Sequence, residues 1–323
     1  MPAAIPIASK QLPLPNNFIK QEDRMFEIFE VVLPEGEKLK GCFWPAKNPT
    51  HNLVMQTGMN EHASRYEAMA LYLNEAGINV SILDAFGQGL NAESIETQER
   101  WPEGAFAKNV DAMHLRLEEV KKNGLPTIIM GHSMGSFMTQ SYAERYPNTA
   151  DKIVLFGTNG PTSIYGLAKF LGKLLVHKGN WDKPNKFLLT LALGGYAKAI
   201  KNRRTDLDWL SYDEKNVDDY IADPYCGHEN TGGFLREFFI GLATLYKKKN
   251  LANISTETPI AIMAGEEDPV GVNGKGPRNL AKLYTKLGVK DVTLKLYPKM
   301  RHEIHNEIGK EQVWSDLKDF LLA

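Results

Sequence analysis

The stretch TIIMGHSMG, residues 127–135, decides how the rest of the chain is interpreted. Its first four residues are apolar and β-rich, which is typical of a buried strand, and a helical pattern follows the stretch directly. Between strand and helix stands the motif G-x-S-x-G, formed by Gly131, Ser133 and Gly135. A turn this tight strains the serine backbone, and residues without a Cβ let strand and helix pass close to it. Because the hydroxyl is then exposed at a helix start, where free N–H groups favour negative charge, the motif predicts a nucleophilic serine.

Acidic residues follow a later strand pattern. Residues 259–263 are apolar, as expected of a core strand, and Glu266, Glu267 and Asp268 come at its carboxyl end. An acid in such a place can orient a histidine and stabilise its charged form. The spacing alone leaves all three carboxylates as candidates for this role.

A histidine follows the last predicted strand. Residues 292–297 have the strand pattern, and His302 lies just beyond them. The order serine, acid, histidine is the one expected for this kind of nucleophile, with His302 taking the proton of Ser133 and passing it to the leaving group. His305 competes for this role. The string HEIH, residues 302–305, is one residue short of the zinc motif H-E-x-x-H, so no metal and no cofactor is predicted.

Short β-rich runs alternate with longer helical patterns along most of the chain, which is the signature of βαβ units. Strands are expected at residues 25–33, 38–44, 52–56, 78–83, 127–130, 152–156, 259–263 and 292–297, the first two as a hairpin. Helices are expected at residues 65–76, 103–122, 134–146, 279–287 and 308–322. The pattern predicts an α/β fold with a mostly parallel central sheet flanked by helices.

The alternation stops between residues 158 and 250. Four helical patterns fill this segment, at residues 164–177, 186–199, 213–222 and 234–247. An insertion of about 90 residues is too long for a simple loop. We expect a helical cap, inserted after the sixth strand, over the carboxyl ends of the strands, where open α/β sheets bind ligands. Residues 1–157 and 251–323 then form the core.

The predicted cap helices are apolar on one face. The residues concerned are Leu167, Phe170, Leu171, Leu174, Leu175, Phe187, Leu188, Leu191, Leu193, Phe234, Phe238, Phe239 and Leu242. Packing against the core explains each stripe singly. Together they should leave an apolar wall facing Ser133, which suits an acyl chain because each buried CH₂ adds ~0.8 kcal/mol. The basic residues of the segment, Lys173, Lys178, Lys201, Arg203 and Arg204, are better explained by a solvated face than by a phosphate site.

The composition excludes several classes of protein. Lys and Arg number 38 against 39 Asp and Glu, a formal net charge of -1, so nothing points to nucleic acid. No apolar run approaches the ~20 residues of a membrane span, and the N-terminus lacks the basic region of a secretory signal. We therefore expect a soluble cytoplasmic protein. The two cysteines, Cys42 and Cys226, are expected as buried free thiols, with one disulfide as the alternative.

Together these motifs resemble the monoacylglycerol lipase and lysophospholipase branch of the α/β-hydrolases. The residues that carry the resemblance are Gly58-Met59-Asn60-Glu61-His62 with Arg65-Tyr66, Asp84 with Gly87 and Gly89, the segment 131–135, Asp268, and Arg301-His302-Glu303 near Asn306-Glu307. The resemblance implies hydrolysis of single-chain carboxylic esters through an acyl-enzyme. It favours Asp268 as the acid, and it implies a small-molecule ester as partner, with at most transient contact with membrane lipid.

The resemblance also implies an oxyanion hole. Family members place one donor just after an H-G dipeptide, which here reads Thr57-Gly58, so the backbone N–H of Met59 is the implied donor, paired with that of Met134. The family pattern D-H-x-G-H-G-x-S also departs here, with Ala85 and Gln88 in place of its histidines. These departures bear on substrate preference. Supporting roles fall to Gly58, Glu61, His132, Gly131 and Gly135.

Two other functions remain open from the sequence. A proline-iminopeptidase-like serine aminopeptidase shares this fold and triad, and it would need cap carboxylates aimed at a substrate amine, for which Glu229 and Glu237 are candidates. A non-catalytic binding module is disfavoured because all three triad candidates are present. Dehalogenase or epoxide hydrolase chemistry is disfavoured because it uses a carboxylate nucleophile where Ser133 stands.

Overall fold

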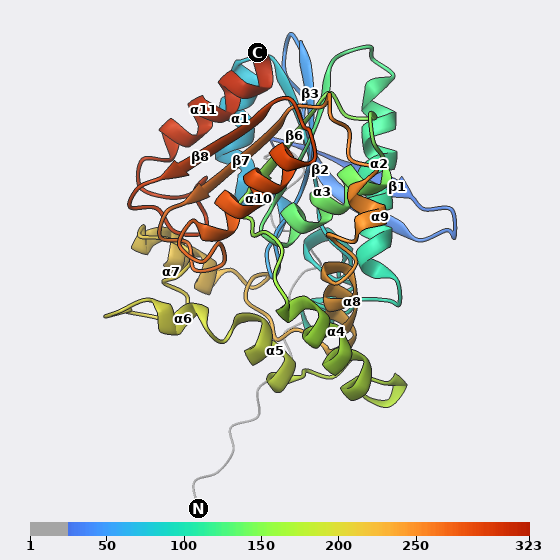
Figure 1. Cartoon of the computed structure of the whole chain (residues 1–323), viewed down its shortest axis with the longest axis vertical. Helices are drawn as coiled ribbons and strands as arrows, with labels where there is room; N and C mark the ends of the chain where they lie inside the picture. The colour runs from blue at the N-terminus through green and yellow to red at the C-terminus, as the bar shows by residue number, and fades with distance from the viewer. Residues whose placement is uncertain (1–24) are drawn as a thin grey trace, which may run out of the picture.

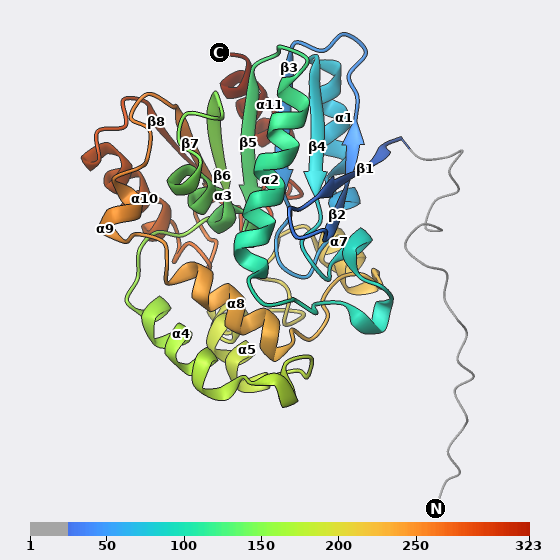
Figure 2. The ribbon, with the colours of Figure 1, turned by 90° about the vertical axis from the view of Figure 1, so that its right-hand side faces the viewer.

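The structure, a computed structural model, describes residues 25–323, so the prediction about a secretory signal at the N-terminus lies outside the described residues. Its centre is an eight-stranded sheet with the strand order β1-β2-β4-β3-β5-β6-β7-β8 (Figures 1 and 2). The strands are β1 (Glu27–Val32), β2 (Lys38–Trp44), β3 (His51–Gln56), β4 (Ile78–Leu83), β5 (Thr127–His132), β6 (Lys152–Phe156), β7 (Ile260–Gly265) and β8 (Val292–Tyr297). β2 is antiparallel to β1 and β4, and every other pairing is parallel. The predicted mostly parallel sheet is confirmed.

Helices cover both faces of the sheet, which is why its central strands are buried and largely apolar. All residues of β4, β5 and β7 are buried, as expected of parallel strands with both faces covered. Side chains alternate between the faces, so Met55 and Val54 of β3 belong to different cores. On one face lie α1 (Glu67–Glu75) and α11 (Lys310–Leu322), and on the other lie α2 (Ala105–Lys121), α3 (Met134–Arg145) and α10 (Lys275–Lys286).

Most element boundaries fall within a few residues of the sequence prediction. The helix expected at 103–122 begins at Ala105, because Gly104 takes a left-handed conformation with φ 78°. The helix expected at 65–76 begins with a 3₁₀ turn, η3 (Ala63–Tyr66), before α1. The described part of the chain has three more short 3₁₀ turns: η4 (Gly89–Asn91), η5 (Ile95–Thr97) and η6 (Lys178–Asn180).

A helical segment, residues 158–250, follows β6 and precedes β7. Its helices are α4 (Ile164–Leu175), α5 (Lys186–Leu193), α6 (Tyr196–Ala199), α7 (Glu214–Ala222), α8 (Gly232–Leu242) and α9 (Lys248–Leu251). In Figure 2, α4, α5 and α8 lie beyond the arrowheads of the strands, at their carboxyl ends. Long-range hydrogen bonds fasten the segment to the core: Trp181 Nε1 donates to Trp101 O (2.7 Å), and Thr231 Oγ1 donates to Glu99 O (2.8 Å).

Two helices of this segment are shorter than predicted. The helix expected at 186–199 ends at Leu193, and the pair Gly194-Gly195 separates it from the short α6. Glycine disfavours a helix interior because it loses the most conformational freedom there. The helix expected at 234–247 ends at Leu242, since Tyr246 has φ 65°, a left-handed conformation that a helix cannot continue through.

Cys42 and Cys226 are both buried and are not joined in a disulfide, which confirms the expectation of two thiols. Within residues 25–323, no helix combines the length and the apolar character that crossing a bilayer requires.

Candidate active site

Ser133 lies at the tip of the turn between β5 and α3. Its backbone has φ 51° and ψ −117°, a sparsely populated conformation that costs ~1–3 kcal/mol. A Cβ on Gly131 would lie 2.1 Å from the carbonyl oxygen of Gly135, and one on Gly135 would lie 2.2 Å from that of Gln56. No side chain fits at either position, so close backbone packing explains why the motif has glycine at both of them.

The structure brings Asp268 and His302 together at the carboxyl ends of β7 and β8. His302 Nδ1 lies 3.0 Å from Asp268 Oδ2, and both side chains are buried. The other carboxylate oxygen, Oδ1, accepts a hydrogen bond of 2.8 Å from the backbone N–H of Val270. Asp268 is thus fixed on both oxygens, and it fixes the histidine ring in turn.

The two neighbouring carboxylates face elsewhere. Glu266 pairs with Arg278 at 3.2 Å on the surface. Glu267 accepts a hydrogen bond from the hydroxyl of Tyr212. Of the three carboxylates that the sequence left open, only Asp268 contacts a histidine.

The other ring nitrogen of His302 is unpaired. Nε2 is buried, yet it has no hydrogen-bond partner among residues 25–323. His302 and Ser133 line the same cavity. Burial would lower the pKa of His302, but the charge of Asp268 and its hydrogen bond outweigh this and raise the pKa above its ordinary value. The ring is therefore oriented at Nδ1 and available for a proton at Nε2.

His305, the alternative base, occupies a different environment. Its ring stacks on Tyr66 at a centroid distance of 4.5 Å, beneath the loop that follows β3. Neither ring nitrogen has a hydrogen-bond partner within the described chain, and His305 does not line the cavity of Ser133. Burial lowers the pKa of His305 to about 3, so the ring is neutral. Its surroundings are those of a core residue.

Two backbone N–H groups, those of Met59 and Met134, belong to residues that line the same cavity as Ser133. Met134 is the first residue of α3, where the N–H groups have no partner within the helix. Met59 belongs to the loop after β3, and the preceding Gly58 is so close that a Cβ there would lie 3.2 Å from Ser133 Cβ. Both methionines line the cavity, and neither N–H donates to any acceptor among the hydrogen bonds of residues 25–323.

A buried carboxylate supports this loop. Glu61 Oε1 accepts hydrogen bonds from the Gly58 N–H (2.6 Å) and the Tyr66 hydroxyl (2.5 Å), and it lies 3.0 Å from His132 Nδ1. Burial raises the pKa of Glu61, but the hydrogen bond from His132 and the charge of Arg65 lower it far more. The carboxylate therefore stays ionised and joins Gly58 to His132, the residue before the serine.

Arg65 extends the network to the histidine loop. It donates to Glu61 Oε2 at 2.9 Å and, through two nitrogens, to both oxygens of Glu303 at 2.9 and 2.8 Å. Glu303 is the residue after His302. The loops that carry Met59 and His302 are therefore held by one buried guanidinium.

The residues that depart from the family pattern are buried, and one of them, Gln88, forms hydrogen bonds to the loop after β3. Gln88 Nε2 donates to the carbonyl oxygens of Gly58 and Glu61, both at 2.9 Å. Thr57 and Ala85 are fully buried. Gln88 thus bridges the two ends of the loop that contains Met59, a role that no sequence pattern indicated.

Asn60, next to Met59, is held by the helical segment. Its backbone has φ 60°, and its carbonyl oxygen accepts from the N–H of Gly227 (3.1 Å) and the hydroxyl of Tyr220 (2.9 Å). Its side chain donates to His228 O (3.0 Å) and accepts from Asn230 Nδ2 (2.7 Å). All four partners lie 160 or more residues away, so sequence reasoning had no signal for this attachment.

A cavity of about 620 Å³ opens above the serine, between the core and the helical segment. Its base contains Met59, Ser133, Met134 and His302, and apolar side chains of α4, α5 and α8 line it: Tyr165, Ala168, Leu189, Leu191, Phe238, Phe239 and Leu242. Polar residues, among them Asn60, His228 and Glu229, line another part. The expected apolar wall is present.

One apolar stripe points away from this wall. On α4, the side chains of Leu167, Phe170 and Leu174 are 53%, 62% and 65% exposed, and Phe187 of α5 is 61% exposed. The expectation that the stripe of α4 packs inward is wrong for these residues. α4 presents Ala168 and Gly172 to the rest of the protein instead, since Gly172 lies against Arg236 and Phe239 of α8.

The pattern of the serine aminopeptidase family S33 matches residues 47–309. This span is most of the chain, and it contains the nucleophile turn, Asp268 and His302. The chain belongs to this family. Among curated proteins, it is 26% identical over 280 residues to a monoacylglycerol lipase of Mycolicibacterium smegmatis, covering 86% of this chain and 90% of that protein. It is 25% identical over 284 residues to the monoglyceride lipase of Homo sapiens, with 86% and 84% covered.

Solved structures agree with the S33 assignment. A thermostable carboxyl esterase from Bacillus coagulans, in complex with glycerol, superposes with a TM-score of 0.84 at 26% identity over 93% of this chain and 98% of that one. A soluble variant of the Saccharomyces cerevisiae monoglyceride lipase shares the fold, with a TM-score of 0.70 at 21% identity over 94% and 96%. This S33 protein is thus an α/β-hydrolase of the monoacylglycerol lipase-like branch, as the sequence resemblance indicated, and a serine ester hydrolase.

Proposed function

We propose that the protein hydrolyses single-chain acyl esters of the monoacylglycerol or lysophospholipid type, and that Ser133, His302 and Asp268 perform the reaction. One observation carries the proposal. The His302 ring is hydrogen-bonded at Nδ1 to a buried carboxylate, its Nε2 has no partner among residues 25–323, and His302 lines the same cavity as Ser133. Nε2 is therefore the ring atom that remains to accept a proton.

In the proposed acylation step, His302 Nε2 takes the proton of the Ser133 hydroxyl as Oγ attacks the ester carbonyl. Asp268 stabilises the imidazolium that forms. The C–O bond to the alcohol then breaks, and the imidazolium returns the proton to the leaving oxygen. In deacylation, a water molecule gives a proton to Nε2 and attacks the acyl carbon; the bond to Oγ then breaks, the acid leaves, and the imidazolium returns the proton to Oγ.

We assign the oxyanion hole to the N–H groups of Met59 and Met134. Both lack an acceptor within residues 25–323, and both lie beside the serine. Each such donor typically contributes ~3 kcal/mol to transition-state stabilisation. Glu61 and Gln88 support the Met59 donor by holding the loop from within, while His132, Gly131 and Gly135 shape the serine turn.

The cavity suits one acyl chain and a small alcohol. Its volume of about 620 Å³ falls in the ~300–1,000 Å³ range of small-molecule sites. The wall formed by α4, α5 and α8 would bury the chain, and the polar part near Asn60 and Glu229 would receive the alcohol. We propose that residues 158–250 act as a cap by supplying this wall.

The cap carboxylates do not favour aminopeptidase activity. Glu237 is buried and accepts a hydrogen bond of 2.9 Å from the Gly104 N–H, so it is not aimed at the cavity. Glu229 lines the cavity but is exposed and lies 3.7 Å from Lys186 Nζ. Asp206, the other carboxylate of residues 158–250 that lines the cavity, pairs with Arg203 at 2.8 Å, so both carboxylates already have a cationic partner.

A panel of p-nitrophenyl esters and monoacylglycerols of increasing chain length, run beside a prolyl arylamide, tests the proposal. We expect kcat/KM to rise with chain length until the apolar wall is filled, and the arylamide to be inert. A fluorophosphonate probe should label the folded protein stoichiometrically. Preference for the arylamide would establish an aminopeptidase, and absence of labelling would establish a non-catalytic module.

A further inference from the structure

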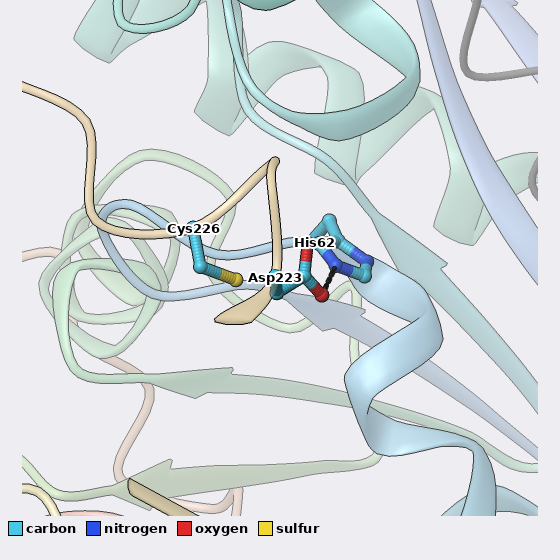
Figure 3. A group of neighbouring side chains, drawn as sticks. All are labelled: His62, Asp223 and Cys226. Atoms are coloured by element: carbon cyan, nitrogen blue, oxygen red, sulfur yellow. Dashed lines mark hydrogen bonds and ion pairs between the residues drawn. The ribbon is translucent and has the colours of Figure 1, made fainter. Parts of the chain in front are cut away.

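Three side chains that bind metals elsewhere in nature meet outside the proposed active site. They are His62, in the loop after β3, and Asp223 and Cys226, in the turn after α7 (Figure 3). His62 offers Nε2, Asp223 a carboxylate oxygen and Cys226 its Sγ, and these atoms all lie within 4.8 Å of one another. None of the three side chains lines the cavity above Ser133.

Further hydrogen bonds orient the side chains of His62 and Asp223. His62 Nε2 lies 2.8 Å from Asp223 Oδ2, and His62 Nδ1 lies 2.8 Å from Ser64 Oγ. Asp223 Oδ1 accepts a hydrogen bond of 2.8 Å from the Tyr225 N–H, so Oδ2, the oxygen that faces His62, is the candidate ligand atom. A histidine whose second nitrogen is hydrogen-bonded, and a carboxylate held on its second oxygen, are the usual surroundings of metal ligands.

We propose that His62, Asp223 and Cys226 form a binding site for a divalent transition-metal ion of the Zn²⁺ class. Imidazole nitrogen, carboxylate oxygen and thiolate sulfur are the ligands that Zn²⁺ takes, at about 2.0–2.3 Å, which places ligand atoms about 3.3–3.8 Å apart in a tetrahedron. His62 and Asp223 separate by about 0.5 Å to reach this geometry, and Cys226 approaches by up to about 1 Å. The side chains of His62 and Asp223 are 16% and 21% exposed, so a water molecule could complete the coordination.

The charges and protons of the three side chains are compatible with a bound divalent ion. The carboxylate of Asp223 and the thiolate of Cys226 together neutralise a 2+ ion. The ion replaces the thiol proton, which leaves to solvent, and displaces the proton shared between His62 and Asp223 onto Nδ1, where Ser64 Oγ accepts it.

A bound ion would link the core to the helical segment. His62 belongs to the core, whereas Asp223 and Cys226 belong to residues 158–250. The next residue, Gly227, donates to the carbonyl oxygen of Asn60 at 3.1 Å, beside Met59. An ion bound there would therefore stabilise the junction that positions this loop.

Cobalt titration of the purified full chain, with a thiol-free reductant, tests the site. We expect a thiolate-to-Co²⁺ charge-transfer band in the near ultraviolet, removed by one equivalent of Zn²⁺, and a higher melting temperature with Zn²⁺ than without it. The band should disappear in Cys226→Ala and persist in Cys42→Ala, the matched control for the other thiol. Zn²⁺ affinity should fall at least tenfold in His62→Gln and Asp223→Asn, and be unchanged in His177→Gln.

The outcomes separate this site from adventitious binding. Absence of the band in the wild-type chain, or its persistence in Cys226→Ala, would overturn the proposal. Equal Zn²⁺ affinity in wild type, His62→Gln and Asp223→Asn would assign the ion to exposed histidines and would also overturn it. Asp223→Asn retains the acceptor for the Tyr225 N–H, so it remains informative if Cys226→Ala fails to fold, which a melting curve without metal reveals.

Discussion

The turn that carries Ser133 and the helix α4 differ in how closely their neighbours hold them. Around the turn, Gly131 and Gly135 leave no space for a Cβ, and Glu61 joins the adjoining loop to His132 through buried hydrogen bonds. On α4, Phe170 and Leu174 are 62% and 65% exposed. The comparison teaches that a local motif determines the backbone conformation where close packing allows no other residue. An apolar stripe on a surface helix, by contrast, does not show whether that stripe faces the core or the solvent.

Replacement of the serine gives the largest expected effect. Ser133→Ala should lower ester turnover by at least about 10³-fold, because removing a triad member leaves only binding and oxyanion stabilisation. The control Ser163→Ala, at an exposed serine that precedes α4, should retain full turnover. Melting temperatures of both variants should stay near that of wild type. Residual turnover above a tenth of wild type in Ser133→Ala would contradict the assignment.

The two histidines provide the next comparison. His302→Ala should reduce kcat by about 10³-fold or more, since it removes the cavity-lining ring that Asp268 orients. His305→Ala should retain most of the turnover and lose stability instead, because it removes a buried ring that stacks on Tyr66. Steady-state kinetics and urea unfolding measure the two effects. The reverse outcome would make His305 the base.

The pH dependence tests the role of Asp268. Activity requires neutral His302, so kcat/KM should fall as pH drops below its raised pKa. Asp268→Asn removes the charge that raises this pKa, so the acid limb should move to lower pH while kcat falls by about 10⁴-fold. Because the folded-state pKa of His302 is raised, its contribution to stability is fully present below its unfolded pKa and is lost as pH rises through the folded pKa. An acid limb that does not move would show that Asp268 is not the partner.

The smallest effects distinguish the two sides of the helical segment. Phe238, on α8, is 7% exposed and lines the cavity, so Phe238→Ala should cost about 3 kcal/mol of unfolding free energy and weaken turnover of long-chain esters. Phe170→Ala, on the outer side of α4, should cost under about 0.5 kcal/mol and leave turnover of a dissolved short ester unchanged. Similar losses of stability in urea unfolding would show that Phe170 is packed inward in solution.

Most of the core was predictable because its signals are local. The strand at Ile78–Leu83 and the turn at Ser133 follow from apolar runs and turn residues that lie within a few positions of each other. The helices of residues 158–250 were less predictable, since the break at Gly194-Gly195 and the left-handed Tyr246 interrupt patterns that look continuous. The order of acid and histidine indicated which loops converge, but not which residue in each loop points inward.

The sequence by itself determined the α/β fold, the nucleophile turn and the loops that complete the site, because backbone sterics and hydrophobic periodicity act over short spans of chain. Only the tertiary structure decided that Asp268 rather than Glu266 or Glu267 contacts His302, and that the stripe of α4 faces outward. It also decided that Asp223 and Cys226 meet His62, which lies some 160 residues earlier. Such contacts depend on how distant segments pack, and side-chain type and spacing along the chain do not encode that packing directly.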